Sequence, residues 1–471
     1  MNQELVTQKP LKSIVRFAIP VMIGSIFQQL YSMVDAVIVG RTLGLQALAA
    51  VGSTGAISFL VIGFVQGVTT GFSVLTAQHF GAQDEEQVKR SVAMSTLLCI
   101  AVTVVVTLIS VLTAMPLLRL METPEDIIAQ AYDYIVVIYY GIGATVFYNM
   151  ISNQVRAIGD SRTPLYFLIM ASVLNIGLDF LFILAFHSGV AGAGWATVIS
   201  QLVSAVACLI YAMKKYPVLR VRARHFLWSW RFAWQHLRLG LPMAFQFSIT
   251  AIGVMVIQRA LTRLGSDVVA AYTAASKIDM LATLAFVSVG TTMATYCAQN
   301  YGAGQYRRIR QGVKSASLMS AVLCVISLAF ILIFRDLLTR LFVSEEDFGA
   351  VIDNVHLYLN INAGTYLLLA ILFVLRNSIQ GVGYSFLAMF AGVIELLMRI
   401  VAASVLANPL GYPGICAANP IAWLGADIFL VLAYWLVVRR MPKEDRMLPT
   451  TKAQDTQSAS DAQSPAPDVQ A

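Results

Sequence analysis

Residues 77–83 read AQHFGAQ, and residues 298–304 read AQNYGAG, 221 positions further along the chain. The same shift of 221 relates GLQALAAVG, which begins at Gly44, to GSDVVAAYT, which begins at Gly265. Both pairs align without a gap. The constant shift indicates that the second half of the chain repeats the first.

Two further pairs extend this repeat. RAIGDS at Arg156–Ser161 matches QGVGYS at Gln380–Ser385 with a shift of 224, and AIP at Ala18–Pro20 matches GLP at Gly240–Pro242. Apolar helices resemble one another by chance, but chance does not easily produce matched Gln-x-Tyr/Phe-Gly turns at matched spacing. We therefore interpret the two halves as an internal duplication.

The composition is that of a membrane protein. The chain has 471 residues, of which 58% are hydrophobic and 12% charged, and its mean hydropathy is +0.73. Soluble globular chains carry about 45–50% apolar and about 25% charged residues. So few charges cannot cover the surface of a soluble protein of this size. The composition excludes a cytosolic enzyme, a disordered chain and a disulfide scaffold, and it predicts an integral membrane protein.

The apolar segments predict the number of spans. A membrane helix takes about 20 mostly apolar residues. Each repeat contains an even number of such segments, so both halves enter the membrane in the same direction, related by an axis along its normal. We expect an all-α integral membrane fold with twelve transmembrane helices in two pseudo-symmetric six-helix lobes around a central cleft. The segments cover residues 14–39, 51–78, 93–115, 131–153, 164–186, 194–213, 239–260, 272–297, 315–334, 357–379, 386–407 and 419–438.

The regions outside the spans have compositions of their own. Trp228, Trp230 and Trp234 lie among arginines between the halves, which is typical of an amphipathic helix at the inner membrane interface. The last residues are rich in Ala, Gln, Ser, Asp, Thr and Pro, as in disordered tails. We expect an amino-terminal lobe at 1–213, a cytoplasmic interfacial linker at 214–238, a carboxy-terminal lobe at 239–442 and a disordered cytoplasmic tail at 443–471.

Loop charge predicts the orientation. The formal net charge is +7. Cytoplasmic loops of membrane proteins carry an excess of Lys and Arg. With the N-terminus inside, about 21 basic residues fall on the cytoplasmic side and about 5 on the outer side. We therefore expect a multi-pass protein of the plasma membrane with both termini in the cytoplasm. The basic charge follows from this topology and does not indicate nucleic acid as a partner.

Several kinds of site are missing from the sequence. The five cysteines include no CxxC pair and lie mostly in apolar runs, which favours buried free thiols over a metal site or disulfides. No GxxxxGK[ST], HExxH or GxSxG motif occurs, and the five histidines are scattered. We expect that the protein is not an enzyme and has no catalytic residue, no cofactor apart from a coupling ion, and no metal other than Na⁺.

Acidic residues inside the spans are the first candidates for a functional site, because a charge at the bilayer centre costs about 2.5–3.5 kcal/mol on insertion scales. Gln28, Tyr31 and Asp35 share one face of the first span. On the fifth span, Asn175 lies one turn from Asp179. A buried carboxylate favours its protonated form and can exchange a proton. Oxygens from Asn and Thr around it could instead help to hold Na⁺.

Four stretches, taken in order, resemble the multidrug and toxic compound extrusion (MATE) transporters. They are IPVMIGSIFQQLYSMVDAVIVGRTLG at 19–44, AQHFGAQ at 77–83, RAIGDSRTPLYF at 156–167 and LNIGLDFLFI at 174–183. The similarity covers about residues 10 to 440, which is nearly the whole chain except the tail. Within this family, the chain looks most like the bacterial branch that is named after DNA-damage-inducible protein F. The resemblance implies a monomeric secondary active exporter.

The resemblance also points to an ion site. Similar transporters carry one acid on the first span and one on the fifth, with Asn and Thr nearby. The matching residues here are Asp35, Asp179, Asn175 and Thr197, with Asn153 as a weaker match. They would bind H⁺ or Na⁺; the alternative is that they only bond neighbouring helices. Some members carry an acidic site in the second lobe, a pattern that this chain does not show clearly.

The expected substrate cleft takes residues from both lobes. Glu395 and Arg399 are spaced i, i+4, and either form an internal ion pair or meet the substrate. Lys277, Asp279 and Asp427 lie inside spans without an assigned role. The residues expected to line the cleft are Gln28, Tyr31, Met33, Tyr139, Gln246, Glu395 and Arg399.

Three functions remain open. The first is efflux of amphipathic, often cationic organic compounds in exchange for H⁺ or Na⁺ by alternating access of the two lobes, with small organic molecules and membrane lipid as partners. The second is a flippase for lipids or lipid-linked oligosaccharides with the same architecture, which predicts a more basic cleft. The third, an intramembrane enzyme, lacks a nucleophile–base or metal constellation.

Overall fold

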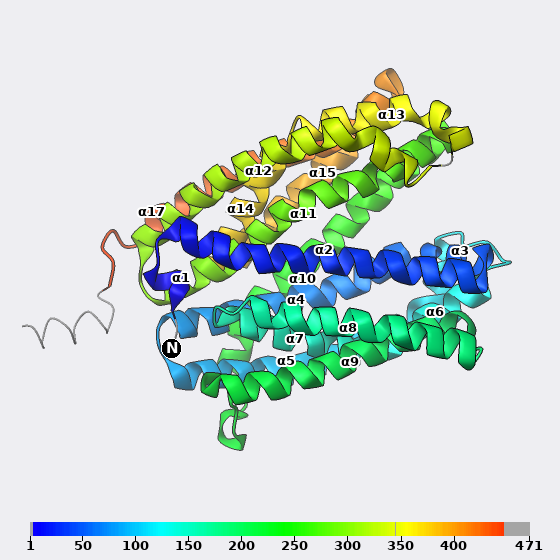
Figure 1. Cartoon of the computed structure of the whole chain (residues 1–471). Coiled ribbons are helices and arrows are strands. Elements are labelled where there is room, and N and C mark those ends of the chain that lie inside the picture. The colour runs from blue at the N-terminus through cyan, green and yellow to red at the C-terminus, as the bar shows by residue number, and fades with distance from the viewer. Residues whose placement is uncertain (1–2, 344, 447–471) are drawn as a thin grey trace, which may run out of the picture.

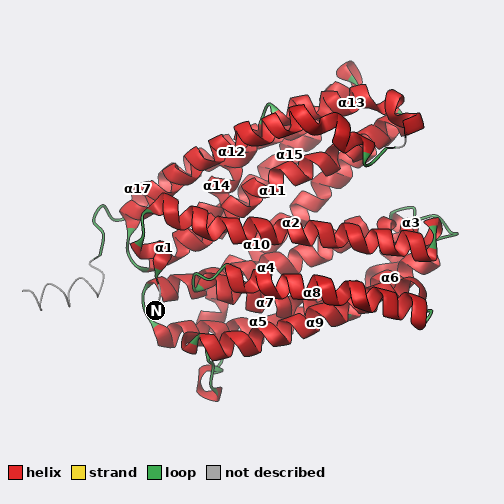
Figure 2. Cartoon of the chain, in the orientation of Figure 1, coloured by secondary structure: helices red, strands yellow, loops and turns green. Residues whose placement is uncertain are grey.

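The protein is a helical bundle in two lobes (Figures 1 and 2). The computed structural model describes residues 3–343 and 345–446, and every regular element in these ranges is a helix. Ten helices are long and apolar enough to cross a membrane by themselves, and two bent pairs of helices do so together. Counting each bent pair as one span, the described residues contain the twelve predicted spans, and the all-α fold class is confirmed.

The first lobe contains six spans, and the chain enters it through the short helix α1 (Glu4–Thr7). Another short helix, α3 (Leu45–Ser53), connects the first two spans. The spans are α2 (Pro10–Leu43), α4 (Gly55–Gly81), α5 (Glu85–Leu120), the pair α6 (Ile128–Tyr140) and α7 (Ile142–Ala157), α8 (Arg162–Phe180) and α9 (Gly189–Lys215).

The second lobe repeats this order. The short helix α16 (Tyr412–Cys416) precedes its last span. The spans are α10 (Trp230–Leu261), α11 (Ser266–Gly302), α12 (Tyr306–Arg340), the pair α13 (Glu345–Ala363) and α14 (Tyr366–Val382), α15 (Ser385–Leu410) and α17 (Ala418–Arg440). Most helices run several residues past the predicted spans.

Both lobes break the same span at the same place. The α6–α7 pair and the α13–α14 pair are each bent by 47°. Gly141 stands at the first break and Gly364 at the second, 223 positions apart. A Cβ atom on Gly141 would lie 2.0 Å from Cγ2 of Val198 on α9, so a side chain there would clash with the neighbouring helix. The break is therefore part of the duplication, although apolar pattern alone did not predict it.

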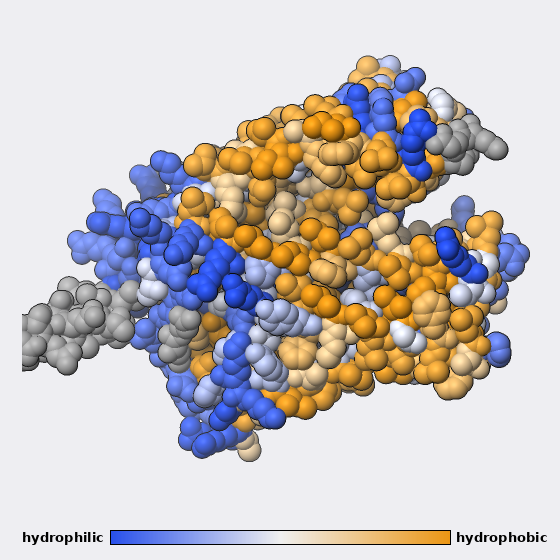
Figure 3. Space-filling model, viewed as in Figure 1, coloured by the Kyte–Doolittle hydropathy of each residue, from blue (hydrophilic) through white to orange (hydrophobic). Residues whose placement is uncertain are grey.

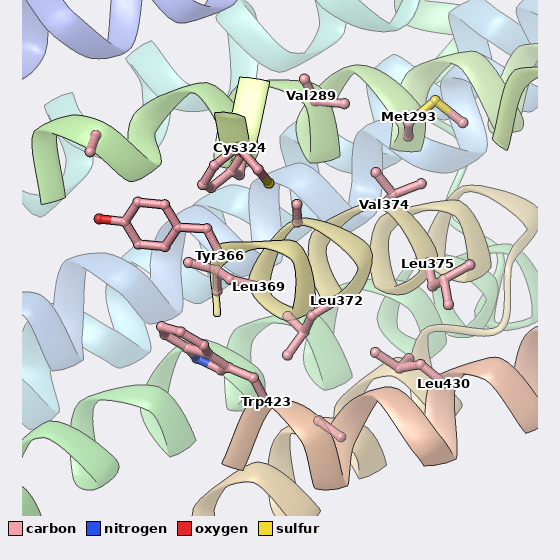
Figure 4. Close-up of a cluster of buried hydrophobic side chains, with 14 of the residues drawn as sticks. Val289, Met293, Cys324, Tyr366, Leu369, Leu372, Val374, Leu375, Trp423 and Leu430 are labelled. Carbon is pink, nitrogen blue, oxygen red and sulfur yellow. The ribbon is translucent and has the colours of Figure 1, made fainter. Parts of the chain in front are cut away.

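Each lobe has an apolar core of its own. One cluster of buried side chains comes mostly from residues 50–244 and another mostly from residues 257–441. Figure 4 shows the second cluster, in which α14, with Leu372, lies between Met293 of α11 and Leu430 of α17. Separate cores allow the lobes to move as units.

The lobes meet along two glycine-lined helices, α4 and α10. A Cβ atom on Gly71 would lie 2.4 Å from Cα of Gly240, and one on Gly67 would lie 2.5 Å from Cα of Ala244. The two backbones are thus in direct contact, which only small residues permit. This contact brings the backbones of the two lobes together at one pair of helices.

The molecule has two different ends, which we name by their character. The basic end, at the left of Figure 1, carries α1, the loops after α4, α7, α9, α11 and α14, and residues 441–446. The open end, opposite, carries α3 and the junction of α12 with α13. Polar residues gather at the basic end in Figure 3, apolar residues cover the middle, and a hollow separates the lobes at the open end.

The prediction of an amphipathic helix in the linker between the lobes is wrong. Residues 216–229 contain only the 3₁₀ turns Pro217–Leu219 and Ala223–His225. The α9 helix ends before Pro217, and the Arg220 side chain donates back to the carbonyl of Met213 at 2.6 Å. Trp230 already begins α10, which continues to Leu261. The predicted linker 214–238 therefore overlaps the helices on both sides.

The predicted tail also differs at its start. The backbone N–H of Arg446 donates to the carbonyl of Gly304 at 3.0 Å, and the Gln305 side chain donates to the carbonyl of Arg446 at 2.6 Å. The first residues of the predicted disordered tail 443–471 are thus bound to the α11–α12 turn. Residues 447–471 lie outside the described residues. The prediction for the five cysteines is confirmed, since all are buried and unpaired.

Asp160 fixes the start of α8 within the RAIGDS sequence. Its Oδ1 accepts the backbone N–H of Arg162 at 2.8 Å, and its Oδ2 is bound by the hydroxyl groups of Thr163 and Tyr216. Burial raises the pKa of Asp160, but these hydrogen bonds together outweigh burial and lower its pKa below the usual value. The carboxylate therefore stays ionised at neutral pH, and a negative charge stabilises the start of a helix.

Candidate functional site

Two acids of the first lobe form a pair. Asp35 lies on α2 and Asp179 on α8, and the two carboxyl groups are within hydrogen-bonding reach of each other. A hydrogen bond between two carboxyl groups needs a proton on one of them. Asp179 has no solvent-accessible surface, and Asp35 is half-buried. The sequence-predicted pair is thus brought together in the structure.

Polar side chains from three helices surround the pair. The hydroxyl of Tyr31 on α2 donates to Oγ1 of Thr197 on α9 at 3.1 Å. The Asn175 amide, oriented so that both its ends have complementary partners, donates to Oδ2 of Asp179 at 3.0 Å. Its oxygen then accepts the backbone N–H of Thr197 at 3.2 Å. Asn175 and Thr197 therefore adjoin the acids, as predicted.

Each acid of the pair keeps an oxygen without a partner. Oδ1 of Asp35 and Oδ1 of Asp179 are buried and accept no hydrogen bond. Buried polar atoms of this kind are costly unless something binds them. A proton or a small cation between the acids would satisfy both atoms. No described group of three or more His, Cys, Asp and Glu side chains could hold a metal, so Na⁺ would have to rely on neutral oxygens as well.

Two features of the site escaped the sequence analysis. Tyr134 of α6 lies near Asp35, Tyr31 and Asp179. A π-helical turn, Leu181–Ala185, follows α8 directly after the site. Such turns break regular helix geometry and occur often at functional sites. The apolar pattern carried no signal for either feature.

Asn153 belongs to another part of the lobe. Its Nδ2 donates to the hydroxyls of Thr69 and Thr70 on α4, at 3.2 Å each, and its oxygen accepts from Arg156. The bonds to the two threonines hold α7 to α4, the bond from Arg156 lies within α7, and none of the three reaches the acid pair. The geometry therefore does not support Asn153, the weaker match to the family, as a residue of the ion site.

The α2 helix separates the acid pair from a cavity of about 880 Å³ between the lobes. Tyr31 and Asp35 face the interior of the first lobe, whereas Met33 and Val37 line the cavity. The opposite walls come from α11 and α13 of the second lobe. A change at the acids can thus reach the cavity through a single helix.

The other residues predicted to line the cleft are scattered. Gln28 is exposed on α2 but is not among the residues lining this cavity. Tyr139 is fully buried in the apolar core of the first lobe, so its assignment to the cleft is wrong. Gln246 accepts a hydrogen bond from Gln380 at 2.7 Å within the second lobe. Of the predicted set, Met33 is the one that lines this cavity.

Glu395 is the centre of a buried ion cluster in the second lobe. Arg376 donates to its Oε2 at 2.6 Å, and Arg399 donates to its Oε1 at 2.8 Å. Asp427 is also buried, near Arg376, and neither of its carboxyl oxygens accepts a hydrogen bond. Of the two alternatives for Glu395 and Arg399, the geometry favours the internal ion pair. The sequence analysis did not find Arg376 because it lies nineteen residues from its partner.

Gly253 leaves room for this cluster on the neighbouring helix α10. A Cβ atom on Gly253 would lie 2.3 Å from Nη1 of Arg399. In the duplication, Gly253 takes the place of Tyr31 (shift 222) and Arg399 takes the place of Asn175 (shift 224). The second lobe therefore has a guanidinium group where the first lobe has the polar neighbours of its acid pair.

Replacing Glu395 by glutamine is expected to destabilise the protein. The change removes the carboxylate that is bonded to both Arg376 and Arg399, which are 4% and 6% exposed. Removing one partner of a buried ion pair costs about 3–5 kcal/mol. Thermal unfolding in detergent measures the loss. Glu125→Gln, a change at an exposed position, is the control, and an unchanged unfolding temperature for Glu395→Gln would contradict the ion cluster.

A family model described as MatE matches residues 20–181 and 242–405, once in each lobe. The chain belongs to the MATE family. Members of this family are membrane transporters and not enzymes. The two matches also coincide with the two halves of the internal repeat.

Relatives of this MATE protein agree over most of its length. It is 30% identical over 373 residues to the Bacillus subtilis protein named "Probable multidrug resistance protein YpnP", covering 79% of this chain and 83% of the relative. It is 28% identical over 358 residues to "Probable multidrug resistance protein YoeA" of the same organism, covering 74% of this chain and 77% of the relative.

A solved structure shares the fold. Its title is "Outward-facing conformation of a multidrug resistance MATE family transporter of the MOP superfamily". The TM-score is 0.85 at 25% identity, and the match covers 94% of this chain and 98% of the other. The arrangement of two six-span lobes is therefore that of a known MATE structure.

The two lobes of the MATE protein close against each other at the basic end, through the repeated Gln-x-Tyr/Phe-Gly turns. Gln78 of the first lobe donates to the carbonyl of Gly381 at 2.9 Å, and Gln299 of the second donates to the carbonyl of Ala157 at 2.7 Å. Both donors and both acceptors are equivalent positions in the duplication. The motif that revealed the repeat thus forms a symmetric pair of cross-lobe hydrogen bonds.

The α1 helix covers this closure. The Gln3 side chain donates to the carbonyl of Phe80 at 2.9 Å, in the first lobe. From the second lobe, Asn300 donates to the carbonyl of Leu5 at 3.1 Å, and Arg308 donates to the same carbonyl. The chain before α2 is therefore bound to both lobes at once and adds to the contacts that keep the basic end shut.

Proposed function

We propose that the protein is a secondary active efflux transporter, which exports small amphipathic organic compounds in exchange for H⁺ or Na⁺ by alternating access of its two lobes. One observation carries the ion coupling. Asp35 and Asp179 form a buried pair in which each carboxyl group keeps one oxygen without a partner. Such a pair gains most from binding one cation, and α2 connects it to the cavity between the lobes.

The relatives support export as the direction and small organic molecules as the substrates. Two of them are named multidrug resistance proteins, and a third, from Staphylococcus aureus, is named "Multidrug export protein MepA". We place the protein in the plasma membrane as a monomer. The basic end faces the cytoplasm, because Lys and Arg are concentrated on cytoplasmic loops. Both termini then lie inside the cell.

With this orientation the structure is an outward-open state. The cavity between the lobes opens away from the cytoplasm, and the Gln78 and Gln299 bonds close the cytoplasmic end. An ion entering from outside would reach the acid pair and neutralise it. The hydrogen bonds of Tyr31 and Asn175 to Thr197 would then rearrange, and α2 with them. Movement of α2 narrows the cavity and releases the substrate outward.

A lipid flippase is the second candidate, and one observation favours it. Arg259 of α10 and Arg263 of the following 3₁₀ turn, Thr262–Leu264, line a hollow of about 500 Å³ next to α15. Lys277 lines the larger cavity. These cations fit the more basic cleft that a carrier of phosphate-bearing lipids needs. The relatives named for multidrug resistance keep efflux as the first candidate.

Gradient-driven transport in liposomes tests the proposal. The purified protein is reconstituted, and a fluorescent organic cation and a fluorescent organic anion are followed in separate experiments under a pH gradient alone and a Na⁺ gradient alone. Movement under one gradient identifies the coupling ion. Movement under neither gradient, together with transfer of a labelled lipid between leaflets, would replace efflux by the flippase function.

A further inference from the structure

The cavity between the lobes has mainly apolar walls. The α2 side contributes Met33 and Val37, and the other side contributes Leu281 of α11 and Phe342 next to α13. The volume of about 880 Å³ falls within the range of small-molecule sites, about 300–1,000 Å³. Such walls hold the apolar body of a ligand, while the few polar groups determine its orientation.

Lys277 is the one positively charged side chain among the described residues that line this cavity. Its side chain lines the cavity, is exposed, and makes no hydrogen bond or ion pair with any described residue. Lys277 lies eleven residues from the start of α11 at Ser266, which is about 16 Å along the helix axis. An ammonium group at this depth in a span is costly unless it faces water or a binding partner.

The acids of the second lobe do not neutralise Lys277. Asp279 accepts a hydrogen bond from Tyr366 at 2.8 Å and does not line the cavity. Glu395 is bound by two arginines. Asp267 lines the cavity ten residues nearer the open end, about 15 Å along α11, and has an interaction of its own. The acid pair of the first lobe lies behind α2.

We propose that Lys277 binds the anionic group of the transported molecule, so that the preferred substrates are amphipathic anions bearing a carboxylate, sulfonate or phosphate on an apolar body. The proposal rests on the proposed transport function and specifies its substrate class. The ammonium group meets the anion, and Met33, Val37 and Phe342 contact the apolar body. This class differs from the cationic compounds that the sequence analysis expected.

Equilibrium binding without any gradient tests the substrate class separately from coupling. Two probes share the dansyl group and differ in charge: dansyl-aminohexanoate is an anion and dansyl-aminoethyl-trimethylammonium is a cation. Fluorescence titration of the purified protein measures both dissociation constants. We expect the wild type to bind the anion about tenfold more tightly than the cation, the effect of one ion pair at intermediate dielectric.

Charge reversal at Lys277 provides the decisive comparison. Lys277→Gln is expected to remove the preference, and Lys277→Glu is expected to invert it. Lys314→Gln, a change at an exposed lysine near the basic end, is the matched control and should leave the preference unchanged. Equal binding of the two probes by the wild type, or an unchanged preference in Lys277→Glu, would overturn the proposal while leaving gradient-driven transport intact.

A second arm identifies the source of the anion. Liposomes containing fluorescent phosphatidic acid report its transfer between leaflets through quenching by dithionite. Transfer that is lost in Lys277→Glu makes a lipid headgroup the ligand of Lys277. Binding of the dansyl anion that depends on Lys277, without lipid transfer, makes the ligand a free amphipathic anion. Both results keep Lys277 as the anion-binding residue.

Discussion

Replacing Asp35 by asparagine is expected to abolish gradient-driven transport, down to the level of protein-free liposomes, while the protein still folds. Asparagine has the shape of aspartate but neither takes up a proton nor carries a charge, so the site with Asp179 can no longer exchange a coupling ion. Its amide can still donate a hydrogen bond to Asp179, which preserves the contact between α2 and α8. Transport in liposomes under the active gradient measures the loss.

The controls for Asp35→Asn separate coupling from folding. Asp133→Asn changes an exposed acid on α6 and should transport like the wild type. Asp179→Asn should behave like Asp35→Asn, because both acids belong to one site. Binding of a fluorescent substrate and the unfolding temperature should stay near the wild-type values in both variants. Full gradient-driven transport by Asp35→Asn would refute the ion-coupling role of the pair.

The fold follows closely from two patterns in the sequence. Apolar length predicted all twelve spans, and the turns around Gln78 and Gln299 predicted the duplication. The bends at Gly141 and Gly364 were not predicted, because a bent span and a straight one have the same apolar length. The linker helix was predicted wrongly because its aromatic and basic composition does not show that Trp230 already belongs to α10.

The site was predictable where an unusual residue stood in an apolar span. Asp35 and Asp179 are such residues, and the structure brings them together. Tyr134 and Arg376 were missed, because a tyrosine is ordinary in a membrane helix and Arg376 lies nineteen residues from its partner Glu395, on another helix. Tyr139 was misplaced because sequence does not say whether an aromatic side chain faces a cavity or a core.

Alanine in place of Gly81 or Gly302 is expected to prevent closure of the basic end and to abolish transport. A Cβ atom on Gly81 would lie 1.9 Å from the carbonyl oxygen of Gln299, and one on Gly302 would lie 1.8 Å from that of Gln78. Both obstacles are backbone atoms of the opposite lobe, which cannot turn aside like a side chain. In either alanine variant, the two lobes must therefore separate at the place where Gln78 and Gln299 form hydrogen bonds across them in this structure.

Labelling of an introduced cysteine reports this separation. Thr295 lines a space of about 20 Å³ between the lobes just inside the closure, so Thr295→Cys is shielded from the basic end. Each glycine variant should make this cysteine accessible to a membrane-impermeant maleimide applied from that end. Gly55→Ala, on α4 like Gly81, is the matched control, since nothing lies within 4 Å of the added Cβ.

Variants that lack only the cross-lobe hydrogen bonds distinguish the effect of the close glycine contacts on transport from the effect of hydrogen bonding. Gln78→Ala and Gln299→Ala each delete one cross-lobe bond but leave the glycine contacts intact, so transport should fall less than in Gly81→Ala. A typical hydrogen bond contributes about 0.5–1.5 kcal/mol, which shifts a two-state equilibrium without forbidding either state. Wild-type transport by both Gly81→Ala and Gly302→Ala would mean that the transport cycle does not require this close contact. In that case the lobes could alternate between their two states with a looser closure of the basic end than the contacts of Gly81 and Gly302 give in this structure.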